Sequence, residues 1–277
     1  MSNIDNIPSR LAGIALLISM TVLITGCSRS ICVMTYNVGA FSKYKENSIP
    51  DVAAAVKAAG AHIVSLNELD SCNVRHGTYQ LEVFASEIGG WDYHFASAFP
   101  YAGGAYGNGV ASRDRILQRY SIALPKGNGS EPRSAAVVET KDYVFASTHL
   151  DHRSEEAAQA QAEVINGWFE EHYAGYRKPV LLCGDMNAEP TSPVMTALSR
   201  CWDILSPLDP TSPCVPHKPD EQEEKGPATC IDYIMCLRSA APVQVKKAEV
   251  MRSLEGYPLG VTDFSDHYPV TAVLAIQ

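Results

Sequence analysis

The chain has 277 residues, 46% of them hydrophobic, and a formal net charge of −9 at pH 7. This length and hydrophobic content suffice for a packed core and argue against an intrinsically disordered chain. The acidic balance argues against a dedicated nucleic-acid-binding protein and against a polybasic membrane contact, because both need clustered lysines and arginines.

The N-terminal segment 1–26 predicts a signal peptide of the lipoprotein type. Its apolar run from Leu11 to Leu23 is short for a membrane span and is typical of the hydrophobic region of a signal peptide. Gly26 precedes Cys27, as in a bacterial lipobox, where the cysteine is lipidated and becomes the new N-terminus. We therefore expect a lipid at Cys27 to hold the mature chain on a membrane.

This anchor implies a location at the bacterial cell envelope. Ser28, rather than an aspartate, follows Cys27, and by resemblance to the lipoproteins of Gram-negative bacteria this favours the outer membrane. Residues 27–30 are expected to form a short tether. Residues 31–277 contain neither an internal repeat nor a linker, so we expect them to form one domain, and we expect that domain to be a monomer.

Short apolar runs rich in β-branched residues predict eight strands. Most have hydrophobic residues at consecutive positions, as strands do when both of their faces are buried. In chain order the predicted strands are 31–38, 63–66, 93–96, 134–140, 143–148, 180–183, 231–236 and 270–276.

Three helices are predicted between these strands. The first covers 51–59, the second covers 154–173 with Ser154 as its N-cap, and the third begins at Ser192 with a proline in its first turn. Each helix has a single apolar face, and strands outnumber helices. The economical architecture is therefore two stacked sheets covered by helices on the outside.

Eight polar residues lie at or beside the ends of predicted strands. Carboxylate and amide oxygens suit a hard cation such as Mg²⁺, and histidine can move protons or hold a phosphate. Residues at strand ends of a layered α/β fold can meet at one rim from distant points in the chain. Together they indicate metal-assisted hydrolysis of a phosphoric ester: Asn37, Glu68, His149, Asp185, Asn187, Asp232, Asp266 and His267.

Over residues 31–276 the order of these residues and their neighbours resembles the endonuclease/exonuclease/phosphatase superfamily. The strongest motifs are Gly-Asp-Met-Asn at 184–187 and Ser-Asp-His-Tyr-Pro-Val at 265–270. Four weaker motifs support the resemblance: Thr-Tyr-Asn-Val at 35–38, Asn-Glu-Leu-Asp at 67–70, Thr-His-Leu-Asp at 148–151 and Ile-Asp-Tyr-Ile at 231–234. Asn67 departs from the glutamine that the family commonly has before the metal-binding glutamate.

The resemblance implies a four-layer α/β/β/α sandwich, in which two packed, mostly antiparallel sheets are flanked by helices. It also implies that Glu68 binds a catalytic Mg²⁺, with help from Asn37 and Asp266. Mn²⁺ is the alternative cofactor. The metal would polarise a phosphoryl oxygen and stabilise the leaving oxygen as a Lewis acid.

The remaining roles also follow from the resemblance. His149 and Asn187 would donate hydrogen bonds to the non-bridging phosphate oxygens as negative charge grows on them. Either Asp185 or His267 would take the proton from the attacking water, and the sequence leaves that choice open. Asp232 would orient the ring of His267 and raise its basicity.

Three arginines are candidates for contacting a substrate phosphate, because guanidinium can bind phosphate with two parallel hydrogen bonds. They are Arg75, Arg113 and Arg133. Arg113 ends the segment 107–113, which resembles a family strand beside the catalytic cleft. For each arginine the competing interpretation is an ordinary exposed side chain.

The sequence therefore predicts a Mg²⁺-dependent phosphohydrolase at the cell envelope, which cleaves a phosphodiester or a phosphomonoester by metal-assisted attack of water. The expected partner is a phosphorylated small molecule or a small phosphodiester. A nuclease is less favoured because the chain is acidic. The alternative from another class is a non-enzymatic surface binding module, a pseudoenzyme that has kept the fold without turnover. The substrate, the ester type and the disulfide pairing stay open.

Overall fold

The computed structural model describes residues 29–212, 227–254, 257–258 and 264–277. The predicted signal peptide, Cys27 and most of the loop that follows residue 206 lie outside these ranges. The first strand begins at Arg29, two residues before the predicted start of the domain. In the described part of the chain, no helix is both long enough and apolar enough to cross a membrane.

Two sheets of six strands and a short hairpin make up the described β structure. The strands are β1 (Arg29–Asn37), β2 (Ile63–Ser71), β3 (Asp92–Tyr101), β4 (Gly104–Ser112), β5 (Gln118–Leu124), β6 (Arg133–Glu139), β7 (Val144–His149), β8 (Val180–Asp185), β9 (Trp202–Ile204), β10 (Asp232–Leu237), β11 (Gln244–Val250), β12 (Ser253–Leu254), β13 (Tyr257–Pro258) and β14 (Val270–Ile276). The helices are η1 (Gly39–Phe41), α1 (Ile49–Ala58), α2 (Gln80–Glu87), α3 (Glu155–Tyr173) and α4 (Pro193–Leu198).

The two large sheets have the strand orders β11-β14-β1-β2-β4-β3 and β5-β6-β7-β8-β10-β9. Each sheet contains one parallel pair, β1–β2 in the first and β7–β8 in the second, and its other pairs are antiparallel. Each parallel pair is joined through a helix, α1 or α3, because a crossover needs a long connection. The predicted sandwich of mostly antiparallel sheets is confirmed.

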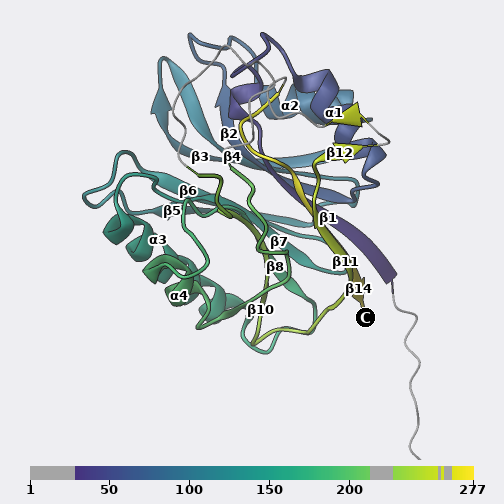
Figure 1. Ribbon diagram of the computed structural model, residues 1–277, viewed down its shortest axis with the longest axis vertical. Helices are drawn as coiled ribbons and strands as arrows, with labels where there is room; N and C mark the ends of the chain where they lie inside the picture. Colours follow the sequence, from purple (N-terminus) through teal and green to yellow (C-terminus); the bar gives the residue numbers. More distant parts are fainter. Residues whose placement is uncertain (1–28, 213–226, 255–256, 259–263) are drawn as a thin grey trace, which may run out of the picture.

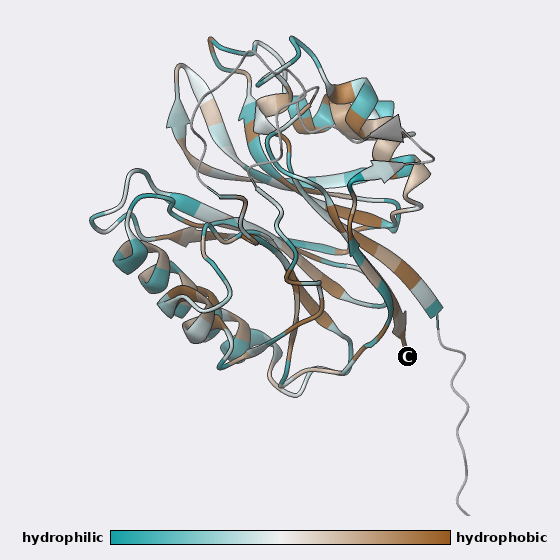
Figure 2. Ribbon diagram, viewed as in Figure 1, coloured by the Kyte–Doolittle hydropathy of each residue, from teal (hydrophilic) through white to brown (hydrophobic). Residues whose placement is uncertain are grey.

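Three hydrophobic cores separate four layers. Figure 1 shows α1 and α2 against the outer face of the first sheet, and α3 and α4 against the outer face of the second. Side chains alternate along each strand between two of these cores. In β1, for example, Ile31 and Val33 pack between the sheets, while Cys32 and Met34 pack on the helix side. Figure 2 accordingly shows hydrophobic stretches along the strands of both sheets.

The helix starts agree with their predicted caps. The hydroxyl of Ser154 accepts a hydrogen bond from Ala157 N at the start of α3, and that of Ser192 accepts one from Met195 N at the start of α4. The elements α2, β5, β9 and β11 were not predicted, nor were the short η1, β12 and β13, and β4 was indicated only by the family resemblance of segment 107–113. β5 and β11 are edge strands with mostly exposed residues, so they lack the apolar run by which buried strands are recognised.

The topology brings the chemical side chains to one end of the sandwich. β1, β2, β7 and β8 end there, because strands of a parallel pair finish at the same edge. The antiparallel neighbours begin there: Asp232 of β10 lies opposite Asp185 of β8, and Val270 of β14 lies opposite Thr35 of β1. Predicted strand-end residues from six strands therefore meet at this rim.

The loop after β7 is organised by the buried carboxylate of Asp151. Its Oδ1 accepts hydrogen bonds from the backbone N–H groups of Arg153 and Ser154. Its Oδ2 accepts from the backbone N–H and the hydroxyl of Ser130. Burial alone would raise the pKa of Asp151, but these hydrogen bonds outweigh burial and lower its pKa to about 2.

We expect Asp151→Asn to lower the free energy of unfolding by about 2 kcal/mol at neutral pH, because an amide nitrogen cannot accept from Ser130. The depressed pKa stabilises the fold above about pH 4, and this contribution is lost as the pH falls towards 2. Urea unfolding at several pH values should therefore show that the difference in the free energy of unfolding between the wild type and Asp151→Asn becomes smaller in acid. Asp209→Asn, at an exposed site, is the control, and a difference that is constant with pH would contradict the assignment.

Candidate active site

The buried amide of Asn37 connects the two sheets at this rim. Its Nδ2 donates hydrogen bonds to Glu68 Oε1 at 3.0 Å and to Asp185 Oδ2 at 3.1 Å, and it lies 3.5 Å from His267 Nε2. Its Oδ1 accepts from Gly39 N at 3.1 Å. One side chain thus fixes residues of β2, of β8 and of the segment before β14 around a common point.

Glu68 lies in an irregular part of β2. Its φ of 61° is unusual for a residue with a side chain, and the pairing of β2 with β4 shifts register between Leu66 and Leu69. The preceding residue, Asn67, is fully buried. Because the bulge breaks the alternation of the strand, both residues are presented to the site, and strain of this kind is concentrated at functional sites.

Asn67 forms a second connection between the sheets. Its Nδ2 donates to the carbonyl of Thr148 at 2.8 Å, and its Oδ1 accepts from Asp185 N at 3.2 Å. Both polar atoms of Asn67, the residue that departs from the family pattern, are therefore hydrogen-bonded. It fixes the ends of β7 and β8 relative to β2 and leaves Glu68 beside Asn37.

His267 is held between carboxylates. Its Nδ1 lies 2.8 Å from Asp232 Oδ2, and its Nε2 lies 3.7 Å from Asp185 Oδ2. Burial disfavours the charged ring, but Asp232 and Asp185 outweigh burial and raise the pKa of His267. Burial and repulsion from Asp232 raise the pKa of Asp185 in turn. Since His267 Nε2 faces the point where Asn37 and Asp185 meet, a positive N–H is presented to whatever binds there.

His149 and Asn187 line the other side of the same centre. His149 Nε2 lies 3.6 Å from Asp185 Oδ2, and its Nδ1 has no hydrogen-bond partner in the described part of the chain. Burial, followed by the charges of Arg133 and His267, lowers the pKa of His149 well below its usual value. Asn187 N donates to Asp185 Oδ1 at 2.9 Å, and Asn187 Nδ2 donates to the carbonyl of Leu150 at 3.0 Å.

The donor set suits a hard divalent cation. Asp266 Oδ2 accepts from Lys43 Nζ at 2.5 Å, whereas Asp266 Oδ1 is buried and has no hydrogen-bond partner among the described residues. Lys43 also interacts electrostatically with Glu68. Burial raises the pKa of Asp266, but His267 and Lys43 outweigh burial and lower it, so this carboxylate is held charged. Buried carboxylate oxygens without donors call for a cation.

Two arrangements of ligands are available. Glu68, Asp266 and the amide of Asn37 are the predicted ligands. Asp185, Asp232 and His267 offer ligand atoms within 4.8 Å of one another and are a second group that could hold a metal ion. In each group one carboxylate has an oxygen bound by an internal cation, Asp266 Oδ2 by Lys43 and Asp232 Oδ2 by His267, while its other oxygen is buried without a hydrogen-bond partner among the described residues.

The three candidate arginines have different environments. Arg133 is buried, its Nη2 lies 3.1 Å from His152 Nδ1, and its charge contributes to the lowered pKa of His149. Arg75 is bound in a bidentate pair to the buried carboxylate of Asp70, at 2.7 and 2.9 Å. Arg113 is exposed and follows Ser112, at the end of β4 that pairs with the start of β2, so it lies at the opposite end of the sheet from the site.

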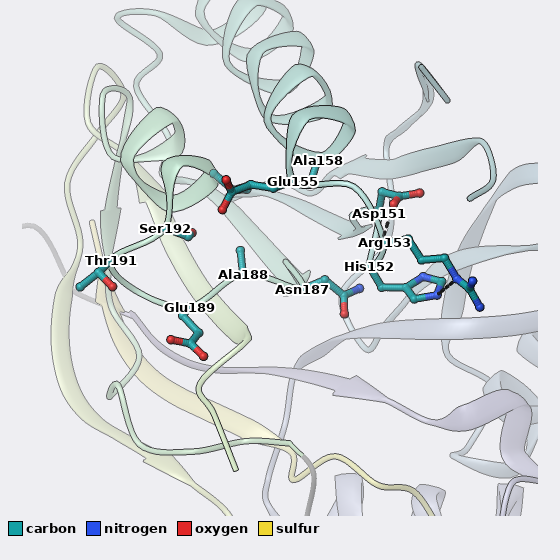
Figure 3. A pocket seen from close by; sticks show the side chains of 11 residues that line it. Asp151, His152, Arg153, Glu155, Ala158, Asn187, Ala188, Glu189, Thr191 and Ser192 are labelled. Carbon is teal, nitrogen blue, oxygen red and sulfur yellow. Dashed lines mark hydrogen bonds between the residues drawn. The ribbon is translucent and has the colours of Figure 1, made fainter. Parts of the chain in front are cut away.

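A pocket of about 470 Å³ opens beside Asn187, between the loops that precede α3 and α4. In Figure 3, His152 and Arg153 lie at one end of it, and Glu155 and Glu189 lie toward the other. Sequence reasoning did not single out Lys43, His152 or Arg153 as site residues. His152 and Arg153 directly follow the Thr-His-Leu-Asp motif, and this position next to a motif is the feature of the sequence that could have indicated them as site residues.

The sequence profile of the Endonuclease/Exonuclease/phosphatase family matches residues 34–267. No curated protein matches the sequence. Among solved structures, the chain is similar to an endonuclease/exonuclease/phosphatase from Bacteroides vulgatus, with a TM-score of 0.71 and 19% identity over 90% of this chain and 100% of that chain.

Two further structures are similar over most of their length. A mannosyl-6-phosphatase from Bacteroides thetaiotaomicron has a TM-score of 0.68 and 20% identity, over 88% of this chain and 99% of that chain. The catalytic domain of human Nocturnin, solved with a bound sulfate anion, has a TM-score of 0.64 and 19% identity, over 90% of this chain and 94% of that chain. At these identities the likeness establishes a shared fold.

We expect Mg²⁺ to stabilise the protein against urea by about 2–3 kcal/mol at a hundredfold excess over its dissociation constant, because only the folded chain assembles the carboxylates. Glu68→Gln should remove most of this gain. Glu171→Gln, at an exposed position on α3, is the matched control and should keep it. Equal stabilisation of the two variants would exclude Glu68 as a ligand.

Proposed function

The chain belongs to the endonuclease/exonuclease/phosphatase family, and on this premise we propose that it is a Mg²⁺-dependent hydrolase of phosphoric esters. Members of this family are generally hydrolases that act on phosphoric esters with divalent metal ions. The proposal for this chain is supported above all by one observation: Asn37 donates hydrogen bonds to Glu68 and Asp185 and lies 3.5 Å from His267 at a single buried point between the sheets.

Asp185 is the group that we propose takes the proton from the attacking water. Its Oδ1 is occupied by Asn187 N, while its Oδ2 faces His149, His267 and the amide of Asn37. The raised pKa of Asp185 makes its carboxylate a better proton acceptor than an ordinary aspartate. His267, which lies between two carboxylates, is held as a cation and is suited to donate rather than to accept.

Three side chains would stabilise the phosphoryl oxygens. The N–H of His267 Nε2, the ring of His149 and the amide of Asn187 all border the same space, and donors fixed before the reaction stabilise negative charge as it develops. Asp232 keeps the ring of His267 oriented through the 2.8 Å contact with Nδ1. A divalent ion held by Glu68 and Asp266 would supply Lewis-acid polarisation of the ester when it is bound. Asn37 has its Oδ1 bound to Gly39 N and its Nδ2 bound to Glu68, so it would orient Glu68 rather than ligate the ion.

The substrate class that we propose is a phosphorylated small molecule. The pocket beside Asn187 has the volume for a group of the size of a sugar. A net charge of −9 gives little general attraction for nucleic acid. The similar structure described as a mannosyl-6-phosphatase supports a sugar phosphate.

We expect the protein to hydrolyse a chromogenic phosphate ester with Mg²⁺ and to lose this activity in EDTA. His267→Ala should lower kcat by about 10³-fold, because a positioned hydrogen-bond donor to a developing oxyanion contributes on the order of 10²–10³ and the neighbouring carboxylates lose their counter-charge as well. The measurement compares bis(p-nitrophenyl) phosphate with p-nitrophenyl phosphate, which distinguishes a diesterase from a monoesterase. His172→Ala, on the exposed side of α3, is the matched histidine control.

Metal-dependent turnover that survives in His267→Ala would exclude the proposed role of His267. A folded protein that binds Mg²⁺ but hydrolyses neither ester would need natural substrates to be screened. A folded protein that neither binds Mg²⁺ nor hydrolyses any ester would instead support the surface binding module, the alternative from another class.

We also propose that the protein acts at the bacterial cell envelope, held at the outer membrane by a lipid on Cys27. The apolar run and the Gly26–Cys27 junction support this location. Mass spectrometry of the protein extracted from membranes should find an N-terminal peptide that begins at a diacylated Cys27. Cys27→Ser should leave residues 1–26 attached, whereas a wild-type chain that still begins at Met1 would contradict the proposal.

A further inference from the structure

We propose that Arg133, His152 and Arg153 form a second anion-binding site beside the catalytic centre, and that the substrate is a small phosphoric ester with a second anionic group. The substrate class rests on the proposed function, whereas the anion site rests on its own geometry. A second phosphate, a sulfate or a carboxylate would share the chemistry that these three side chains recognise.

No protonation state of His152 allows both of its ring nitrogens to accept hydrogen bonds from the two arginines that they face. Arg133 Nη2 lies 3.1 Å from His152 Nδ1, and Arg153 Nε lies 3.2 Å from His152 Nε2. Guanidinium groups only donate hydrogen bonds, and an imidazole ring has at most one nitrogen that accepts. At least one N–H of the ring therefore faces a guanidinium N–H. An anion placed among them would accept from both donors and relieve this arrangement.

Arg133 adds an unused donor to this cluster. Its side chain is only 2% exposed, and its Nε has no hydrogen-bond partner in the described part of the chain. A buried N–H without an acceptor is costly, which indicates that a ligand supplies the acceptor. The acid that faces Arg133 is Glu131, whose Oε1 lies 3.0 Å from Nη1 on the other side of the guanidinium.

Arg153 and His152 lack a neutralising carboxylate. Over the described residues, no carboxylate lies within ion-pair distance of Arg153. The carboxylate of Asp151 is adjacent, but both of its oxygens are occupied by the backbone N–H groups of the loop and by Ser130. The cluster therefore has positive charge available on a chain whose overall charge is −9.

The cluster adjoins the catalytic centre. The charges of Arg133 and His152 both act on His149, and His152, Arg153 and Asn187 line one pocket (Figure 3). An ester whose scissile phosphate contacts His149 and Asn187 would thus bring its second anion to this cluster. A volume of about 470 Å³ accommodates a small connecting skeleton, and the hydroxyls of a sugar could donate to Glu155 and Glu189 at the other end of the pocket.

The experiment compares fructose 1,6-bisphosphate with fructose 6-phosphate as substrates of the Mg²⁺-loaded protein. We expect kcat/KM to favour the bisphosphate by about tenfold or more, because a charge-assisted contact typically has an effect of this size. Arg153→Gln should reduce this preference about tenfold. Arg177→Gln removes an exposed arginine away from the pocket and should keep the wild-type preference.

A binding measurement separates this inference from the proposed hydrolase. In EDTA, where no turnover is expected, calorimetry should detect tighter binding of the bisphosphate than of the monophosphate by the wild type, and Arg153→Gln should abolish the difference. If neither ester is hydrolysed but this pattern holds, the anion site stands and the hydrolase fails. If both esters are hydrolysed, and neither activity nor binding distinguishes them or responds to Arg153→Gln, the anion site is overturned and the hydrolase stands.

Discussion

The buried amide of Asn67 connects the two sheets, and the geometry of the site depends on it. Its nitrogen donates to Thr148 at the end of β7, and its oxygen accepts from Asp185 at the end of β8. Without this side chain, a buried carbonyl and a buried N–H would lose these partners, and leaving such groups unpaired costs about 1–3 kcal/mol each. Asn67 also positions its neighbour, Glu68, which Asn37 then joins to Asp185.

The second constraint is the repulsion among the carboxylates that this geometry brings together. Burial and Asp232 raise the pKa of Asp185, and His267 acquires a raised pKa from the same carboxylates. Lys43 neutralises one side of Asp266, and Asp266 Oδ1 is buried without a donor among the described residues. Internal cations thus compensate part of the charge, and a divalent ion would compensate more of it. An acidic centre of this kind binds a phosphoric ester only together with positive charge, which explains why cationic groups surround it.

Lys43 and His267 belong to segments next to the first sheet, whereas a second set of cationic groups comes from the second sheet and its loops. Arg133 starts β6, and His152 and Arg153 belong to the loop that Asp151 organises before α3. Arg75 is a contrasting case, because its guanidinium is already bound by Asp70 and is less available to a ligand. Arg75 and Arg133 have the same guanidinium group, and their partners decide which of them has hydrogen-bond donors left for a ligand.

Much of this protein can be predicted from the sequence by itself. The apolar runs predict the buried strands because strands covered on both faces need hydrophobic residues at successive positions. The serines before α3 and α4 predict helix starts because their hydroxyls accept free backbone N–H groups. The motifs at the ends of these strands also indicated which side chains would meet, since strand order and direction in a layered fold bring such ends to one rim.

Only the tertiary structure decided which of these groups contact one another. The edge strands β5 and β11 have mostly polar, exposed residues, so their place is determined by pairing with a neighbour and not by their own composition. The pairing of Arg75 with Asp70, the distance of Arg113 from the site and the contact of Lys43 with Asp266 depend on loops and sheet register. Residues far apart in sequence interact through space, and local sequence patterns contain no information on those distances.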